Sequence, residues 1–366
     1  MDSTTTDHAT PELGHTLLLI DELIPGEWFA DWHWGSLAAV IAVSVVVLIK
    51  GADWLVEGAS GLSYRLGMPK IIVGATVVSL GTTSPEAAVS VMAAWEGDSG
   101  LALGNAVGSV IADTGLIFGI GCMMAPLPAD SFVLTRQGRV QFGSALVLAA
   151  LCYGFYFHGG EGSVLGRPVG VGFLIGLVMY LYASVRWARQ HSTGQEALVD
   201  EVGAYSGGVL FLIGSMLFGL LVVIVAARFL IVSVQELAVQ MNVPPVVVSS
   251  TIVALGTSLP ELVVGLTAVR RKHPEILIGN VIGADILNVL FVAGASATAK
   301  PLVIPQLFLI IHLPSMLVVL LLFRYFVVRA CYSGSFARWN GVPLVLIYVA
   351  FVIIQYVYDP TAAEGH

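Results

Sequence analysis

The sequence predicts an all-α polytopic membrane protein with about ten transmembrane helices, arranged as two inverted five-helix repeats with broken helices at the midplane. Two observations lead to this prediction. Hydrophobic residues make up 57% of the chain, charged residues make up 11%, and the mean hydropathy is +0.89, values well outside the range of soluble domains. In addition, one short motif occurs twice, 175 positions apart, as Gly81–Glu86 and Gly256–Glu261.

Apolar segments long enough to cross a bilayer core, about 20 residues each, recur about ten times along the 366 residues. The predicted spans are Ser36 to Gly58, Ile71 to Trp95, Leu101 to Met124, Val140 to Phe157, Val169 to Trp187, Gly207 to Val232, Val246 to Val269, Ile276 to Thr298, Ile304 to Phe323 and Val342 to Tyr358. The predicted domains are an extracytoplasmic N-terminal tail at 1–33, a first five-helix repeat at 34–187, a cytoplasmic linker at 188–205, a second, inverted five-helix repeat at 206–358 and a C-terminal tail at 359–366.

Positively charged residues gather in the loops that follow the odd-numbered spans. Those loops hold Arg65, Lys70, Arg136, Arg139, Arg186, Arg189, Arg270, Arg271, Lys272, Arg324, Arg329 and Arg338. The opposite loops hold only Arg167 and Lys300. Because Lys and Arg mark the cytoplasmic side, this bias places both termini outside, and the first 33 residues, which lack Lys and Arg, are expected to be a retained polar tail. Since five spans is an odd number, the second half then enters the membrane in the opposite sense.

Each copy of the repeated motif places a carboxylate beside a proline inside an apolar segment. The first copy reads Gly-Thr-Thr-Ser-Pro-Glu and ends at Glu86, and the second reads Gly-Thr-Ser-Leu-Pro-Glu and ends at Glu261. An isolated charge at this depth costs about 2.5 to 3.5 kcal/mol. Two such costs at equivalent positions indicate one shared cation site, since a buried pair of carboxylates would otherwise repel.

The prolines explain how such segments could offer ligands. Pro85 and Pro260 lack an amide donor, so we expect the helix to open around 79–82 and 254–257. Irregular backbone at membrane depth survives only where it faces protein or water. The freed carbonyls, the neighbouring hydroxyls and the two glutamates form an all-oxygen set, which suits Ca²⁺ and Na⁺ and does not suit zinc or copper.

A second repeated motif, Gly-Asn-x-x-Gly, lies in the third and eighth spans at 104–108 and 279–283. Its glycines form faces that allow helices to approach closely. Beyond them lie Ser109, Asp113, Asp285 and Asn288. Asp113 aligns with Asn288 across the repeat, and we expect this pair to complete the site from the opposite wall. Asp285 aligns with an apolar residue, Val110, and its role is left open.

Structural explanations compete with functional ones at several of these positions. A proline kink can be only a packing device, and Asn105 and Asn280 are expected to be interhelical hydrogen-bond elements rather than ligands. Lys50, Asp53 and Glu57 lie within one to two helical turns, where local ion pairing or snorkelling is expected. Glu86 and Glu261 have no comparable structural explanation.

Other functional classes lack their signatures in this sequence. There is no His-Glu-x-x-His arrangement, Walker loop, Gly-x-Ser-x-Gly elbow or basic nucleic-acid patch. Three cysteines, Cys122, Cys152 and Cys331, show neither metal-ligand nor disulfide spacing. We therefore expect no enzyme activity, no cofactor and no nucleic-acid partner, with membrane lipid and inorganic cations as the partners. The sequence does not predict an oligomeric state.

The two motifs resemble the alpha-repeats of the calcium/cation antiporter superfamily, and specifically its prokaryotic sodium/calcium exchanger membrane region. The resemblance covers about fifty residues in each half. It implies a multi-pass protein of a prokaryotic inner membrane that exchanges Ca²⁺ for Na⁺ by alternating access. It also implies a set of ion-binding residues, in which Ser79 and Ala254 contribute their main-chain carbonyls. The set is Ser79, Thr82, Thr83, Glu86, Ser109 and Asp113 in the first half and Ala254, Thr257, Ser258, Glu261, Ala284 and Asn288 in the second.

Two positions depart from the resemblance. Ala284 stands where the family usually has a serine, which removes a hydroxyl from an expected Na⁺ position. Asp285 replaces a more usual neutral residue and adds a fourth acid, which leaves H⁺- or K⁺-coupled exchange open. An intramembrane aspartyl protease using Asp113 and Asp285 is a remote alternative, since the Gly-x-Gly-Asp signature is absent. A passive channel fits paired broken helices less well than alternating access does.

Overall fold

The computed structural model describes residues 26–29, 32–192, 208–241 and 254–358. Within these ranges the chain is nearly all helical, and eight helices are long and apolar enough to cross a membrane. These are Trp34–Leu66, Ser99–Met124, Ser131–Gly159, Arg167–Gln190, Val209–Gln240, Pro274–Ala299, Phe308–Ser333 and Arg338–Gln355. Most of the two predicted tails and of the predicted linker lies outside the described residues.

The first half contains helices, two short strands and two π-helical turns. Its elements are η1 (Gly26–Phe29), α2 (Trp34–Leu66), α3 (Lys70–Val73), the π-helical turn η2 (Gly74–Val78), α4 (Ser79–Thr82), α5 (Ser84–Glu96), α6 (Ser99–Ala112), the π-helical turn η3 (Asp113–Ile117), α7 (Phe118–Met124), β1 (Leu127–Pro128), α8 (Ser131–Gly159), β2 (Val164–Leu165) and α9 (Arg167–Ser192).

The described elements of the second half follow a similar order, with η7 and η8 in addition. It contains α10 (Val209–Gln240), α12 (Ala254–Thr257), α13 (Leu259–Arg270), α14 (Pro274–Leu287), the π-helical turn η6 (Asn288–Ala293), α15 (Gly294–Ala299), β3 (Leu302–Val303), the π-helical turn η7 (Phe308–His312), α16 (Leu313–Ser333), β4 (Ser335–Phe336), η8 (Arg338–Asn340) and α17 (Gly341–Tyr358). The predicted span that begins at Val246 has its first residues outside the described part of the chain.

The two proline motifs interrupt their helices, as predicted, but not where the sequence suggested. Ser79–Thr82 forms the helical turn α4, and the interruption falls at Thr83, just before α5. In the second half it falls at Ser258, between α12 and α13. The reason is that Pro85 withdraws a donor only from the carbonyl four residues earlier, while the Thr83 amide still donates to Ser79 O at 2.8 Å. The expected opening around 79–82 is therefore wrong.

Two short antiparallel strand pairs join the halves at opposite ends of the helices. β1 pairs with β4 through Leu127 and Phe336, and β2 pairs with β3 through Leu165 and Leu302. The first pair joins the loops after the predicted third and ninth spans, and the second joins those after the fourth and eighth. The Lys and Arg distribution assigns both loops of a pair to the same side of the membrane. This agreement is expected if the two halves cross the membrane in opposite senses.

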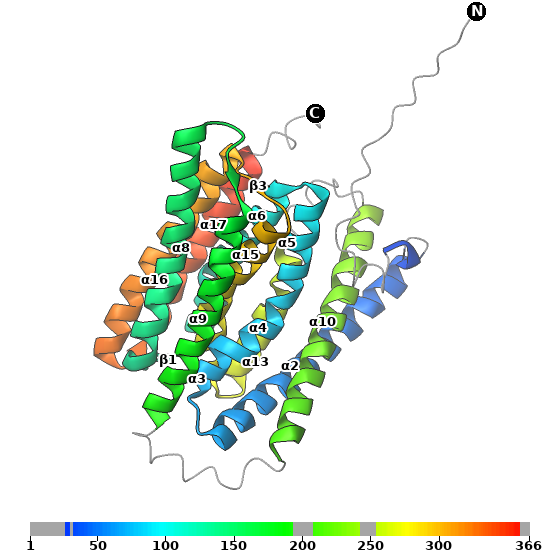
Figure 1. Cartoon of the computed structure of the whole chain (residues 1–366). Coiled ribbons are helices and arrows are strands. Elements are labelled where there is room, and N and C mark those ends of the chain that lie inside the picture. Colours follow the sequence, from blue (N-terminus) through cyan, green and yellow to red (C-terminus); the bar gives the residue numbers. More distant parts are fainter. Residues whose placement is uncertain (1–25, 30–31, 193–207, 242–253, 359–366) are drawn as a thin grey trace, which may run out of the picture.

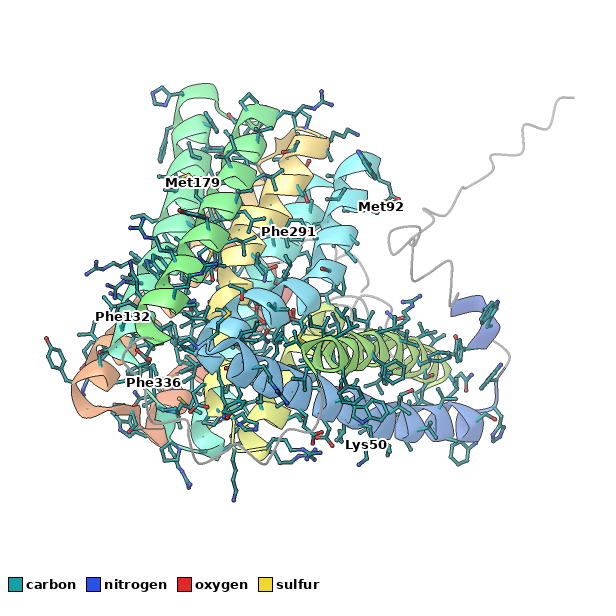
Figure 2. All side chains as sticks on the ribbon, turned by 60° about the horizontal axis from the view of Figure 1, so that its bottom comes forward. Lys50, Met92, Phe132, Met179, Phe291 and Phe336 are labelled. Carbon is teal, nitrogen blue, oxygen red and sulfur yellow. The ribbon has the colours of Figure 1, made fainter. Side chains whose placement is uncertain are left out.

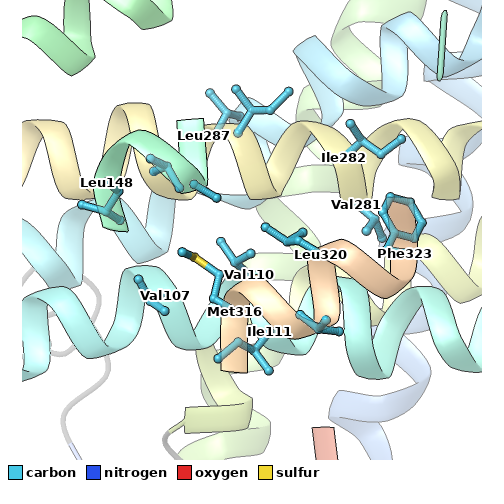
Figure 3. Packing of buried hydrophobic residues seen from close by; sticks show 14 of the residues in the cluster. Val107, Val110, Ile111, Leu148, Val281, Ile282, Leu287, Met316, Leu320 and Phe323 are labelled. Carbon is cyan, nitrogen blue, oxygen red and sulfur yellow. The ribbon is translucent and has the colours of Figure 1, made fainter. Parts of the chain in front are cut away.

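The helices that carry the second repeated motif form the interior of the bundle. In α14, every residue from Ile276 to Leu287 is buried. Apolar side chains of α6 and α14 pack against α8 and α16, as Figure 3 shows for Val110, Leu148 and Met316. The hydrophobic core thus lies directly around the helices that bear Asp113 and Asn288.

Helices α2 and α10 lie side by side and lean away from the rest of the bundle (Figures 1 and 2). A Cβ at Gly219 would meet the backbone of Gly51 and Leu55 at 2.6 Å, so glycine is needed for this close approach. Their outward faces carry exposed apolar side chains such as Val46 and Leu221, which suit lipid. The protein is a multi-pass membrane protein.

The predicted glycine face of the eighth span packs tightly, as expected. A Cβ at Gly279 would collide with the carbonyl of Ile71, and one at Gly283 would meet Ala75 O at 2.5 Å. These contacts press α14 against α3 and η2, the segment that leads to the first proline motif. The equivalent face of the third span shows no such close contact among the described residues, since a Cβ at Gly104 would lie 3.9 Å from His312 Nε2 and one at Gly108 would meet nothing within 4 Å.

Candidate cation site

Four acidic or amide side chains from both halves are buried in the centre of the bundle. Glu86 lies in the first turn of α5 and Glu261 in the first turn of α13, each with 1% of its surface exposed. Asp113 and Asn288 begin η3 and η6 and are equally buried. Glu86, Glu261 and Asp113 are close enough for their charges to repel one another. The sequence-predicted acids are therefore brought together.

Hydrogen bonds cross between the halves in a symmetric pattern. The Thr82 hydroxyl donates to Asn280 Oδ1 at 3.3 Å, and the Thr257 hydroxyl donates to Asn105 Oδ1 at 3.2 Å. These two bonds are equivalent under the 175-residue offset. Asn105 also donates to Glu86 O and to Ser90 Oγ, at 3.3 and 2.9 Å. The expectation that the two asparagines form interhelical hydrogen bonds is confirmed.

A second pair of contacts shows where the symmetry fails. The Ser258 hydroxyl contacts Ser109 Oγ at 3.3 Å. The equivalent pair would be Thr83 and Ala284, and alanine has no hydroxyl, so Thr83 instead donates to Glu261 Oε1 at 3.4 Å. The departure at Ala284 thus changes the partner of a neighbouring threonine as well as removing one oxygen.

Asp113 and Asn288, which were expected to complete the site from the opposite wall, are in hydrogen-bond contact with each other. Asn288 Nδ2 donates to Asp113 Oδ2 at 3.4 Å, and both residues start π-helical turns. Such turns often occur at functional sites because the extra residue displaces side chains from their normal helical positions. Sequence reasoning missed these turns, and also η2 immediately before Ser79, since local helical distortion has no composition of its own.

Several buried oxygen atoms in this cluster have no hydrogen-bond partner among the described residues. They are both carboxylate oxygens of Glu86, Oε2 of Glu261, Oδ1 of Asp113 and Oδ1 of Asn288. Burying carboxylates without compensation is strongly unfavourable, so such groups normally bind a cation or another donor. Oxygen atoms from both halves are thus left available in one place.

Ser79 and Ala254 are the two predicted positions that were expected to offer main-chain carbonyls. Ser79 is buried, its hydroxyl donates to Thr76 O at 3.4 Å, and its carbonyl accepts from Thr82 Oγ1 at 3.3 Å. Ala254 begins α12. In the described ranges, no three His, Cys, Asp or Glu side chains form a conventional metal-binding group. Hydroxyl, amide and carbonyl oxygens would therefore have to supply much of any coordination shell.

Asp285 has two polar partners outside this cluster. Thr114 Oγ1 and Gln141 Nε2 each donate to Asp285 Oδ2 at 2.5 Å. Neither partner was identified from the sequence, because hydropathy alone does not reveal which face of α8 meets α14. Asp285 interacts with the charge of Asp113 but presents its hydrogen-bonded oxygen to Thr114 and Gln141.

The acidic residues of α2 do not pair locally, contrary to the expectation for Lys50, Asp53 and Glu57. Asp53 forms ion pairs with Arg270 and Arg271 at 2.9 and 2.7 Å, and Glu57 pairs with Arg271 at 2.8 Å. The hydrogen bond to Asp53 raises the pKa of the Arg271 guanidinium. Helix α2 is therefore tied to the end of α13, because the arginines that follow the seventh predicted span reach across.

Two helical halves that enclose acidic residues between interrupted helices define a secondary ion transporter. The chain belongs to the sodium/calcium exchanger family, because the family model described as sodium/calcium exchanger protein matches residues 36–186 and 211–357. It is therefore a cation antiporter of the sodium/calcium exchanger type and not an enzyme. Nothing supports the aspartyl protease alternative.

Individual relatives agree with this assignment. The chain is 28% identical over 347 residues to the sodium/calcium exchanger MaX1 of Methanosarcina acetivorans, which covers 87% of this chain and 97% of the relative. It is 33% identical over 267 residues to the inner membrane protein YrbG of Escherichia coli, covering 72% and 80%. The solved structure of the sodium-calcium exchanger NCX_Mj matches its fold with a TM-score of 0.73 and 24% identity, covering 89% of this chain and 99% of that one.

Proposed function

We propose that this protein exchanges Ca²⁺ for Na⁺ across the membrane by alternating access to one central site. The observation that supports this most strongly is the convergence of Glu86 and Glu261, buried and with unpartnered oxygens, from equivalent positions of the two halves. The family assignment and the relative named as a sodium/calcium exchanger are consistent with it. Inverted halves around a fixed site are the usual architecture for alternating access.

The charges in the site give a physical basis for exchange. Glu86, Glu261 and Asp113 supply three buried carboxylates whose charges interact, and hydroxyls and carbonyls supply neutral oxygens. Ca²⁺ needs six to eight oxygen ligands including carboxylates. Several Na⁺ ions could balance the same negative charge, but not while Ca²⁺ occupies it. Competition for one set of carboxylates therefore couples the two ions.

We assign the ion-binding roles to the complete set predicted from the sequence. Glu86 and Glu261 would bind Ca²⁺ directly, with Asp113 and Asn288 completing the opposite wall. Main-chain carbonyls at Ser79 and Ala254, and the hydroxyls of the set, would supply the neutral ligands. The set is Ser79, Thr82, Thr83, Glu86, Ser109, Asp113, Ala254, Thr257, Ser258, Glu261, Ala284 and Asn288.

We favour Na⁺ over K⁺ or H⁺ as the proposed coupling ion. The fourth acid, Asp285, which raised those alternatives, accepts hydrogen bonds from Thr114 and Gln141 through Oδ2, and its charge acts on Asp113. K⁺- or H⁺-coupled exchange is the second candidate because the hydroxyl at position 284 is absent.

The test is transport by the purified full-length protein in proteoliposomes. Ca²⁺ flux is measured under imposed Na⁺, K⁺ and pH gradients, one at a time. We expect flux with the Na⁺ gradient only, and its loss in Glu86→Gln and Glu261→Gln, because the amide removes the charge that a divalent ion requires. The exposed Glu161→Gln is the matched control and keeps parental flux. Flux driven by protons or K⁺ without Na⁺ would contradict the proposal.

We also propose that the protein lies in a prokaryotic inner membrane, as its prokaryotic relatives suggest, and that both termini lie outside, on the basis of its Lys and Arg distribution. In a variant lacking the native cysteines, Glu161→Cys should be labelled from outside only. Ser333→Cys should be labelled from the cytoplasm only, since both residues are exposed at opposite predicted sides. Labelling of both from one side would overturn this orientation.

A further inference from the structure

Next to Asp113, one buried polar cluster has no counterpart at the equivalent positions of the other half. It consists of Asp285 on α14, Thr114 in η3 and Gln141 on α8, joined by the two 2.5 Å hydrogen bonds to Asp285 Oδ2. Their exposed fractions are 1%, 0% and 3%. Placing three polar side chains at this depth is costly in a membrane protein, so a function for the cluster is expected.

The symmetry of the chain provides an internal comparison for this cluster. Under the 175-residue offset, the positions equivalent to Asp285, Thr114 and Gln141 are Val110, Val289 and Met316. All three are buried apolar residues, and Figure 3 shows Val110 and Met316 packed in the core. The same fold therefore packs well at these positions without any polar group. Packing alone does not explain the polar cluster.

The polar cluster adjoins the charged residue Asp113 and not its uncharged equivalent, Asn288. Thr114 directly follows Asp113 in η3, whereas Val289 directly follows Asn288 in η6. A π-helical turn departs from the regular α-helical hydrogen-bond pattern and occurs frequently at functional sites. Thr114 fixes η3 to α14 through Asp285, and Gln141 fixes Asp285 to α8.

We propose that Asp285 is a positioning residue, which through Thr114 holds the π-helical turn η3 so that the Asp113 carboxylate stays directed at the central cations. This inference rests on the proposed function. Asp113 needs this support because it is repelled by Glu261 and by Asp285 itself, while its hydrogen bond from Asn288 is long, at 3.4 Å. Asn288 carries no charge and is not subject to this repulsion. Residues that orient ligands in this way typically change metal affinity about 10- to 100-fold when replaced.

The experiment copies the apolar cluster of one half into the other. The triple variant Thr114→Val, Gln141→Met and Asp285→Val installs the residues that already pack at the equivalent positions, so it should fold and insert. We expect its KM for Ca²⁺ in Na⁺-driven flux to rise about 10-fold or more, with a maximal rate close to the parent's. A parental KM in the correctly inserted triple variant would overturn the proposal.

Single variants separate positioning from a merely structural role. Thr114→Val should raise the KM for Ca²⁺ about 10-fold, whereas Thr114→Ser, which keeps the hydroxyl, should retain the parental value. Ser144→Ala is the matched control, because its hydroxyl donates to the backbone of Gln141 and not to Asp285. If Thr114→Ser is as impaired as Thr114→Val, the hydroxyl is not what matters and the proposal fails.

Equilibrium binding of radioactive Ca²⁺ to the purified proteins distinguishes this proposal from the proposed function. If the parent binds Ca²⁺ but shows no Na⁺-driven flux, the exchange function fails. The positioning role still predicts about 10-fold weaker binding by the triple variant. If the parent exchanges Ca²⁺ and the triple variant binds it equally well, only the positioning role fails. A parent that neither exchanges nor binds Ca²⁺ overturns both.

Discussion

In the first half, Ser109 and Asp113 lie one turn apart on α6 and η3, whereas the equivalent positions of the second half, on α14 and η6, hold Ala284 and Asn288. Both halves have a π-helical turn at this point and an asparagine that bonds the opposite threonine. Only the groups that carry charge or a hydroxyl differ. The comparison indicates that symmetry builds the site, while the departures from it determine which ions the site prefers.

The largest effect on Ca²⁺ flux should come from removing the carboxylate of Asp113 or moving it to position 288. Asp113→Asn leaves two amides facing each other and removes one of three carboxylates, so we expect Ca²⁺ flux to fall at least about 100-fold, as for loss of a direct ligand. The combined change Asp113→Asn with Asn288→Asp restores the charge at the symmetric position. We expect it to recover part of the flux, which is measured in the same proteoliposome assay.

Recovery should remain incomplete, because η6 lacks the polar cluster that supports η3. Full recovery in the double variant would mean that the two halves are interchangeable and would contradict the asymmetry described above. No recovery, in protein that is correctly inserted, would show that charge at position 288 does not reach the site.

A smaller loss of Ca²⁺ affinity, equal in the two halves, is expected when the equivalent asparagines are replaced. Asn105→Ala and Asn280→Ala each remove one of the two equivalent hydrogen bonds from Thr257 and Thr82. A buried hydrogen bond contributes about 1 kcal/mol, so the KM for Ca²⁺ should rise roughly 5- to 10-fold in each variant. Titration of flux with Ca²⁺ checks this. A difference larger than threefold between the two variants would show that the symmetry of these contacts is not functional.

The smallest effect concerns the missing hydroxyl. Ala284→Ser supplies an additional oxygen and gives Thr83 the partner that Ser109 provides for Ser258 in the other half. We expect the apparent Na⁺ affinity to increase about threefold with little change for Ca²⁺, since Na⁺ depends more on neutral oxygens. Flux is measured across Na⁺ concentrations. An unchanged Na⁺ dependence would mean that position 284 is not a ligand.

Much of this architecture could be predicted from the sequence because it depends on composition and repetition. Hydropathy predicts the membrane helices, and the two copies of the proline motif locate Glu86 and Glu261 in one cluster. The predicted domain boundaries and ion ligands stay predictions. The expectation that Asn105 and Asn280 form interhelical hydrogen bonds also came from the repeat, although their threonine partners were not predicted.

Other features could not be predicted because they depend on contacts distant in the sequence. The interruption at Thr83 falls after the expected opening, since the hydrogen bond from its amide to Ser79 survives. The partners of Asp285 come from different helices, and the ion pairs of Asp53 come from residues more than two hundred positions away. Such contacts are set by how helices rotate against each other, which apolar periodicity does not specify.

The central claim is that both halves form one shared cation site, and Ca²⁺ binding stoichiometry tests it most directly. Equilibrium dialysis with purified full-length protein should give one Ca²⁺ per chain, displaced by Na⁺. Either Glu86→Gln or Glu261→Gln alone should abolish this binding, because each removes charge from the same site. Two Ca²⁺ per chain in the parent, with one retained in each single variant, would show separate sites in the two halves and contradict the account.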